Sequence, residues 1–172
     1  HRSLDSSVDG SPLKMSNLRP DATAPSGAGR RIGVVASRYN EEIVERLLAG
    51  ARMALAAQGV EPEAIEVVRV PGAWEIPLAL EALAASHRFN ALIALGAVIR
   101  GETAHFEYVA GECSRGVAQV ALRHRLPVAF GVLTCEDVEQ ARARTGGAAG
   151  NKGEEAALAA LEMVVVLERI AG

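Results

Sequence analysis

Short apolar runs alternate along this chain with longer segments in which apolar residues recur every three or four positions. The apolar runs occupy residues 31–37, 65–70, 91–99 and 128–134. Helical spacing follows each run, over residues 41–58, 75–86, 106–122 and 137–144, and again over residues 154–170. Apolar strands that are each followed by a helix are typical of a parallel sheet covered on both faces. The pattern therefore predicts an α/β fold, a three-layer α/β/α sandwich around a four-stranded parallel sheet.

The predicted elements begin only after a polar N-terminal segment. Residues 1–29 are mainly Ser, Pro, Gly and Asp with scattered apolar residues, and no helix or strand period runs through them. We interpret residues 1–29 as a flexible arm, in part an expression remnant ahead of Met15, and residues 30–172 as one domain. The first helix of this domain starts after Asn40, a good N-cap residue, and Gly59 ends it.

Composition narrows the possible partners. The 172 residues carry a net charge of -3 without a basic stripe, which argues against nucleic acid. No apolar run approaches the roughly 20 residues that span a bilayer, and the N-terminus lacks the apolar core of a secretory signal. The two cysteines, Cys113 and Cys135, lie far apart and form no metal-binding pattern. We expect a cytoplasmic protein without a metal, a membrane partner or a nucleic-acid partner.

Aromatic residues are rare, and most of them follow strands. Four of the six, Tyr39, Trp74, Phe106 and Tyr108, come just after the first three predicted strands. Ligands of parallel α/β sheets gather at the carboxyl ends of the strands. This concentration favours a flat, stackable ligand, and the alternative is that the rings cap the core beneath the loops.

Two loops resemble nucleotide-binding motifs without matching them. The loop "GGAAGNKG" follows a helix and has Gly153 where a P-loop needs Ser or Thr. The first strand leads into "SRYN", which contains no G-x-G-x-x-G. We therefore expect no dinucleotide, and no other cofactor is indicated.

His105 differs from the other three histidines in its predicted position. It follows the third strand through the loop "RGETA" and stands at the first turn of a helix, on the edge that carries the aromatics. A histidine there can transfer protons near neutral pH. A lone histidine is more often structural, and this alternative stays open.

A basic pair near the C-terminus is a candidate anion site. Arg144 ends the fourth predicted helix, and Lys152 lies between two glycines of the following loop. Together they could bind a phosphate, helped by backbone N–H groups of the "GET" loop, with the side chain of Glu102 turned away. The alternative is a solvated arginine that completes a helix C-terminus.

Five stretches together resemble the lumazine synthase family, in family order over Arg31 to Ile170. They are "VVASRYN", "VPGAWEIP", "GAVIRGETAHFEYV", "PVAFGVLT" and "EQARARTGGAAGNKGEEAA". The resemblance implies a flavodoxin-like sheet and a cofactor-free condensation of two small-molecule substrates. These are 5-amino-6-(D-ribitylamino)uracil and 3,4-dihydroxy-2-butanone 4-phosphate, and the products are 6,7-dimethyl-8-ribityllumazine, phosphate and water. This transferase reaction is the penultimate step of riboflavin biosynthesis.

The resemblance also implies roles for individual residues. His105 matches the proton-transfer residue, with Glu107 as an orienting carboxylate. The positions implied for the pyrimidine and its ribityl chain are Tyr39, Ala73, Trp74, Glu75, Ala97, Val98, Ile99 and Phe130, the last lent by a neighbouring subunit. The positions implied for the phosphate are Glu102, Thr103, Arg144 and Lys152.

A site shared between subunits implies a homo-oligomer. The resemblance implies a pentamer or an assembly of pentamers, up to an icosahedral capsid, and small residues such as Gly111 and Gly116 would allow the helix at 106–122 to pack closely around an axis. Two alternatives remain: a storage or cage protein that binds flavin or lumazine on the same scaffold, and a monomeric flavodoxin-like module.

Overall fold

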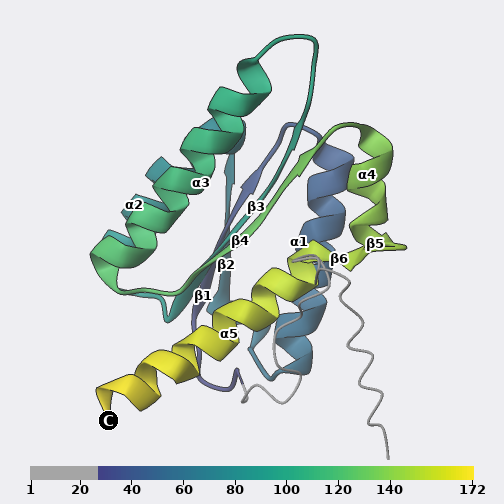
Figure 1. The fold of residues 1–172 in the computed structure, drawn as a ribbon. Coiled ribbons are helices and arrows are strands. Elements are labelled where there is room, and N and C mark those ends of the chain that lie inside the picture. The colour runs from purple at the N-terminus through teal and green to yellow at the C-terminus, as the bar shows by residue number, and fades with distance from the viewer. Residues whose placement is uncertain (1–26) are drawn as a thin grey trace, which may run out of the picture.

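The computed structural model describes residues 27–172 (Figure 1). Its strands are β1 Ile32–Ser37, β2 Ile65–Val70, β3 Ala91–Ile99, β4 Val128–Cys135, β5 Thr145–Gly147 and β6 Gly150–Asn151. Its α-helices are α1 Glu41–Ala57, α2 Ile76–Ala85, α3 His105–His124, α4 Val138–Ala143 and α5 Lys152–Ala171. Two short 3-10 turns, η2 Pro62–Ala64 and η3 Ala73–Glu75, lie before and after β2.

The main sheet has four parallel strands in the order β2-β1-β3-β4. Helices α2 and α3 cover one face, and α1, α4 and α5 lie on the other (Figure 1). Neighbouring strand residues alternate between the two core layers, so that Val34 packs toward α1 and α5 while Val35 packs toward α2. The structure confirms the predicted three-layer sandwich with a four-stranded parallel sheet.

Two local features differ from the sequence prediction. Asn40 precedes α1 in a left-handed conformation, with φ 60°, and its side chain makes no capping hydrogen bond. Instead its Nδ2 donates to the carbonyl oxygen of Ala97 at 3.0 Å, which ties the start of α1 to β3. The second feature is the β5–β6 hairpin, whose strands are short and rich in glycine and carry no apolar alternation that sequence patterns detect.

The N-terminal segment enters the domain beside the end of α1. Gly27 is buried, and its N–H donates to the carbonyl oxygen of Gln58. The rest of the predicted arm, residues 1–26, lies outside the described residues. Within residues 27–172, no helix is both long enough and apolar enough to cross a membrane.

Candidate active site

An aromatic pocket of about 560 Å³ opens at the carboxyl edge of the sheet. It is lined by Tyr39, Gly72, Ala73, Trp74, Glu75, His105, Tyr108 and Val109. Because these residues follow β1, β2 and β3, one edge of the sheet brings together side chains that are up to 70 positions apart in sequence. Tyr39, Trp74 and His105 therefore surround one cavity.

The turn after β2 fixes the wall of the aromatic pocket. Glu75 Oε2 accepts a hydrogen bond from the N–H of Gly72 at 3.0 Å, which closes the turn that carries Trp74. A Cβ on Gly72 would lie 2.7 Å from the Tyr39 ring, so the missing side chain lets the ring approach the backbone. The rings of Tyr39 and Trp74 remain 65% and 58% exposed. In the single chain, the pocket is open on one side.

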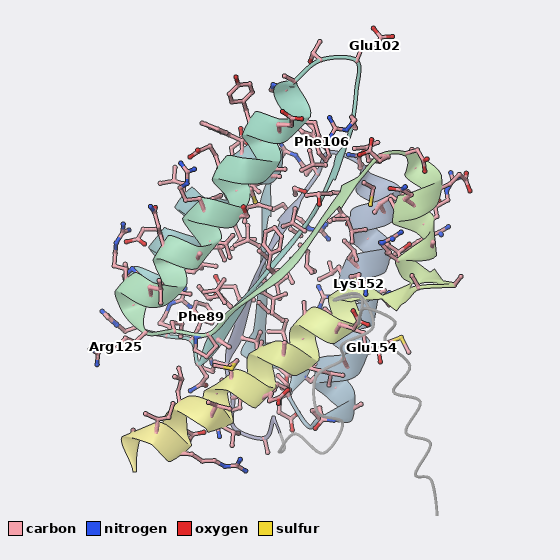
Figure 2. All side chains as sticks on the ribbon, in the orientation of Figure 1. Phe89, Glu102, Phe106, Arg125, Lys152 and Glu154 are labelled. Atoms are coloured by element: carbon pink, nitrogen blue, oxygen red, sulfur yellow. The ribbon has the colours of Figure 1, made fainter. Side chains whose placement is uncertain are left out.

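His105 is the first residue of α3, and its side chain is exposed at the aromatic pocket. Its backbone N–H donates to Thr103 Oγ1 at 3.4 Å. The carboxylate of Glu107, expected to orient the imidazole, instead pairs with Arg100 at 3.4 Å. Glu102 lies at the outer end of the loop before α3 and points away from the body of the molecule (Figure 2).

A second cavity of about 400 Å³, the arginine pocket, runs along the edge strand β4. Its walls come from β4, α5 and the end of α4. Arg144 NH1 donates to the carbonyl oxygen of Gln140 at 2.8 Å, and Lys152 Nζ pairs with Glu155 at 2.9 Å. Burial raises the pKa of the Cys135 thiol, and the charge of Arg144 offsets part of that rise. The pocket therefore presents two cations beside one carboxylate.

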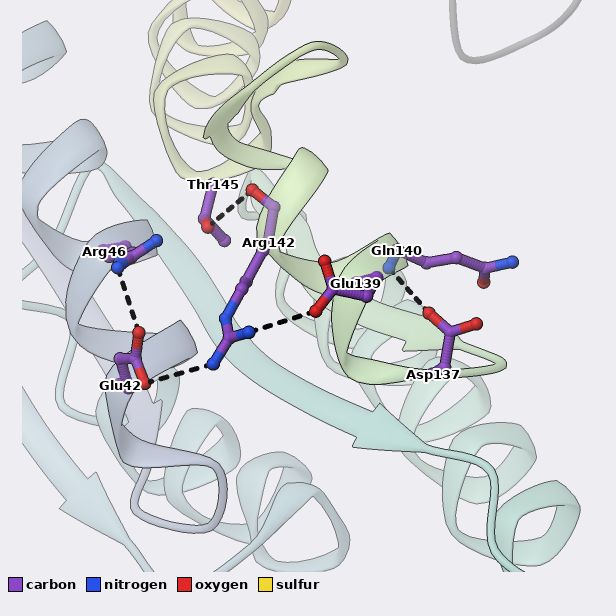
Figure 3. Close-up of polar contacts among 7 residues, drawn as sticks. All are labelled: Glu42, Arg46, Asp137, Glu139, Gln140, Arg142 and Thr145. Atoms are coloured by element: carbon purple, nitrogen blue, oxygen red, sulfur yellow. Dashed lines mark hydrogen bonds and ion pairs between the residues drawn. The ribbon is translucent and has the colours of Figure 1, made fainter.

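Hydrogen bonds and ion pairs hold α4, the helix that ends directly before Arg144. Asp137 Oδ1 accepts from the N–H of Gln140 at 2.8 Å and caps the helix N-terminus. Arg142 points the other way, and its NH2 lies 3.9 Å from Glu42 Oε2 of α1 (Figure 3). These contacts fix the start and the side of α4, and Arg144, the residue directly after the helix, lines the arginine pocket beside β4.

The two cavities share no lining residue. Phe130, Arg144 and Lys152 line the arginine pocket, whereas the other predicted side chains lie near the aromatic pocket or at the ends of β3. Ala97 is buried with its carbonyl bound to Asn40, and Val98 and Ile99 are half-buried. Together with Glu102 and Thr103, these three residues line neither cavity of the single chain.

Some lining residues were not among the predicted site residues. Tyr108 could have been predicted, because it is one of the aromatic residues that follow β3, but it was not among the residues expected to bind substrate. Nothing in the sequence distinguishes Val109 from other apolar residues or Gly72 from other turn residues. In the arginine pocket, Glu155 is set beside Lys152 by the helical spacing of α5.

A parallel α/β sandwich with an aromatic cavity at the carboxyl edge of its sheet and a basic cavity along its edge strand is an arrangement typical of an α/β enzyme. The family model described as 6,7-dimethyl-8-ribityllumazine synthase matches residues 29–168. A protein of that name from Desulfovibrio desulfuricans is 48% identical over 156 residues, covering 91% of this chain and 100% of that protein. Another from Stenotrophomonas maltophilia is 51% identical, covering 91% and 99%. The chain belongs to the 6,7-dimethyl-8-ribityllumazine synthase family, which confirms the resemblance found in its sequence.

Proposed function

We propose that this chain condenses 5-amino-6-(D-ribitylamino)uracil with 3,4-dihydroxy-2-butanone 4-phosphate. The products are 6,7-dimethyl-8-ribityllumazine, phosphate and water, and the reaction is the penultimate step of riboflavin biosynthesis. The observation that carries this conclusion, besides the family, is the aromatic pocket in which Tyr39 and Trp74 face the same space as His105.

The chemistry requires orientation and proton transfer from the protein. The pyrimidine substrate brings its own amine, which attacks the ketone to form an imine with loss of one water. Phosphate is then eliminated, and the ribityl-bearing nitrogen attacks the remaining carbonyl, so that the ring closes with loss of a second water. We assign the proton transfers to His105, because its exposed imidazole faces the pocket in which the flat substrate would stack. Holding both substrates in register supplies much of the acceleration.

We assign the remaining site residues by their place around the two cavities. Ala73 and Glu75 lie beside Trp74 in the turn that would receive the ribityl chain. Ala97, Val98 and Ile99 end β3 at the carboxyl edge of the sheet, and their backbone would contact the pyrimidine. Arg144 and Lys152 would bind the phosphate, because a guanidinium can donate two parallel hydrogen bonds to it. Glu102 and Thr103 would add main-chain and hydroxyl donors.

We further infer that each complete site takes its aromatic pocket from one subunit and its arginine pocket from a neighbour. In support, the cavities are separate in the single chain, Phe130 is 44% exposed on the edge strand, and the aromatic rings are more than half exposed. A ring of five chains, alone or in a larger icosahedral capsid, is our proposal for the assembly. We place it in the cytoplasm, where the buried thiols of Cys113 and Cys135 would stay reduced.

Mixing the purified chain with both substrates and recording lumazine absorbance tests the function. His105→Ala should lower kcat by about tenfold without abolishing turnover, because substrate positioning survives the loss of the imidazole. The matched control is His87→Asn, an exposed histidine at the opposite edge of the sheet whose φ of 56° asparagine also tolerates. It should keep the wild-type rate.

Two outcomes would contradict the proposal. A wild-type rate no higher than the spontaneous reaction would exclude the enzyme, and tight flavin binding by such an inactive chain would favour a storage protein. Equal kcat values for His105→Ala and the wild type would remove the histidine from the mechanism while leaving the overall reaction in place.

A further inference from the structure

Arg100 makes contacts in three directions at the end of β3. Its Nε lies 2.9 Å from Glu136 Oε2 and its NH1 lies 3.4 Å from Glu107 Oε1. Its guanidinium also stacks 4.6 Å above the centre of the Phe106 ring. Glu136 directly follows β4, whereas Phe106 and Glu107 belong to the first turn of α3. The side chain therefore connects the turn that begins with His105 to the edge strand of the sheet.

Within residues 27–172, little else supports the loop that leads into α3. Residues 101–105 are all exposed, and a Cβ on Gly101 would meet no atom within 4 Å. The hydrogen bonds found there are local: His105 N–H donates to Thr103 Oγ1, and Glu107 N–H donates to the carbonyl oxygen of Ala104. Glu102 stands at the far end of this loop, while Phe106 lies where the helix meets the body (Figure 2).

The other end of the connection is firmly held. The backbone N–H of Arg100 donates to the carbonyl oxygen of Cys135 at 2.9 Å and so extends the β3·β4 pairing. The N–H of Glu136 donates to Gln140 Oε1 at 2.8 Å in the first turn of α4. Both β4 and α4 therefore hold the backbone of Glu136, from which its carboxylate reaches the guanidinium.

Arginine suits this place for geometric reasons. Its planar guanidinium can donate along different edges to two carboxylates while its face lies on an aromatic ring, which an ammonium cannot do. Exposed ion pairs add little to stability, so the main effect of these contacts is to orient the turn. The hydrogen bonds to Glu136 and Glu107 raise the pKa of Arg100, which keeps the group charged.

We propose that Arg100 is a positioning residue that holds the first turn of α3 against β4 and thereby aims the His105 imidazole into the aromatic pocket. The inference rests on the proposed function of His105 as the group that transfers protons. It also gives Glu107 a different role from the one expected from sequence. Its carboxylate accepts a hydrogen bond from the Arg100 guanidinium instead of orienting the His105 imidazole.

The test compares Arg100→Gln with Arg88→Gln. Arg88 offers a matched control, because its guanidinium lies 4.7 Å from the Phe89 ring and 2.8 Å from a Glu66 oxygen at the opposite edge of the sheet. Figure 2 places Phe89 near the lower end of the sheet and Phe106 near its upper end. Arg100→Gln should lower kcat by about fivefold with KM changed less than about twofold, and Arg88→Gln should change neither.

A double-mutant cycle separates positioning from general destabilisation. If Arg100 acts through His105, adding Arg100→Gln to His105→Ala should lower kcat no further. Arg100→Lys should recover only part of the rate, and Glu136→Gln, which removes the anchor, should lower kcat in the same direction. Additive losses in the double variant would overturn the proposal.

A measurement that does not depend on turnover completes the test. Amide hydrogen exchange of residues 101–109 should accelerate severalfold in Arg100→Gln and stay at the wild-type rate in Arg88→Gln. Unchanged exchange with unchanged kcat would refute the positioning role. A wild-type chain that forms no lumazine would refute the proposed function instead, and exchange would still show whether Arg100 holds the turn.

Discussion

Arg144 is the side chain whose removal should weaken binding most selectively. It faces the arginine pocket, and its guanidinium is set by the hydrogen bond to Gln140. Arg144→Gln should raise KM for the phosphate-bearing substrate by about tenfold or more, because a charge-assisted pair of hydrogen bonds is lost. KM for the pyrimidine should change little. Steady-state kinetics with each substrate varied in turn measures both constants.

An arginine on α4, the helix directly before Arg144, is the control. Arg142 lies two positions earlier and pairs with Glu139 at 3.1 Å, on the side of α4 that faces α1 (Figure 3). Such exposed pairs contribute little, so Arg142→Gln should leave both KM values within about twofold of the wild type. Equal KM increases in the two variants would show that α4 has shifted and that Arg144 has no specific role.

Individual site residues differ in how far the sequence alone predicts them. Tyr39, Trp74 and His105 are predictable because each follows a strand, and parallel strands end at one edge. The role of Arg100 is not, because its anchor Glu136 is 36 positions away and the pairing depends on the β3·β4 register. The sequence therefore predicts which residues line the pocket, whereas the residues that position them can be identified only from side-chain contacts in the structure.

At the scale of elements, the backbones of α1 and α5 come into close contact at Gly153. A Cβ there would lie 1.9 Å from the carbonyl oxygen of Leu47, so the backbone of one helix rests on the other. Gly153→Ala should lower the free energy of unfolding by at least about 2 kcal/mol and lower the thermal midpoint with it. The added methyl group would overlap the backbone of α1, and the helices would have to move apart to make room for it. The matched control is Gly101→Ala in the loop before α3, where a Cβ would meet no atom of the described residues within 4 Å.

The two glycine variants should move in opposite directions. Alanine at position 101, where φ is not positive, should stabilise the protein by up to about 1 kcal/mol, because it restricts the unfolded chain. Thermal unfolding followed by circular dichroism measures both changes. A normal midpoint for Gly153→Ala would mean that α1 and α5 separate more easily than their contact suggests.

Helices and strands with a strong apolar period were predictable, and the exceptions have physical reasons. The β5–β6 hairpin is held by contacts with neighbouring elements, since Asn151 Nδ2 donates to the carbonyl oxygen of Arg46 at 3.1 Å. Gly116, expected to serve packing around an axis, lies against Pro77 of α2, where a Cβ would approach within 2.6 Å. Sequence reveals a small residue but not which neighbour requires it.

At the scale of the whole molecule, the separation of the two pockets leads to the strongest test of a shared site. If neighbouring chains complete each site, light scattering should give a mass of at least five chains of 18.0 kDa. A monomer would contradict the shared site, because no second chain would bring Phe130 and Arg144 to the aromatic pocket.

Mixing two impaired variants tests through enzyme activity whether His105 and Arg144 of one site come from different chains. In oligomers refolded from equal amounts of His105→Ala and Arg144→Gln chains, about a quarter of shared sites should combine a native His105 from one chain with a native Arg144 from its neighbour. At low concentrations of the phosphate substrate, where each variant alone is slow, the mixture should therefore recover a clear fraction of the wild-type rate. If both residues served a site within one chain, no chain in the mixture would be intact, and the rate would stay at the average of the two variants.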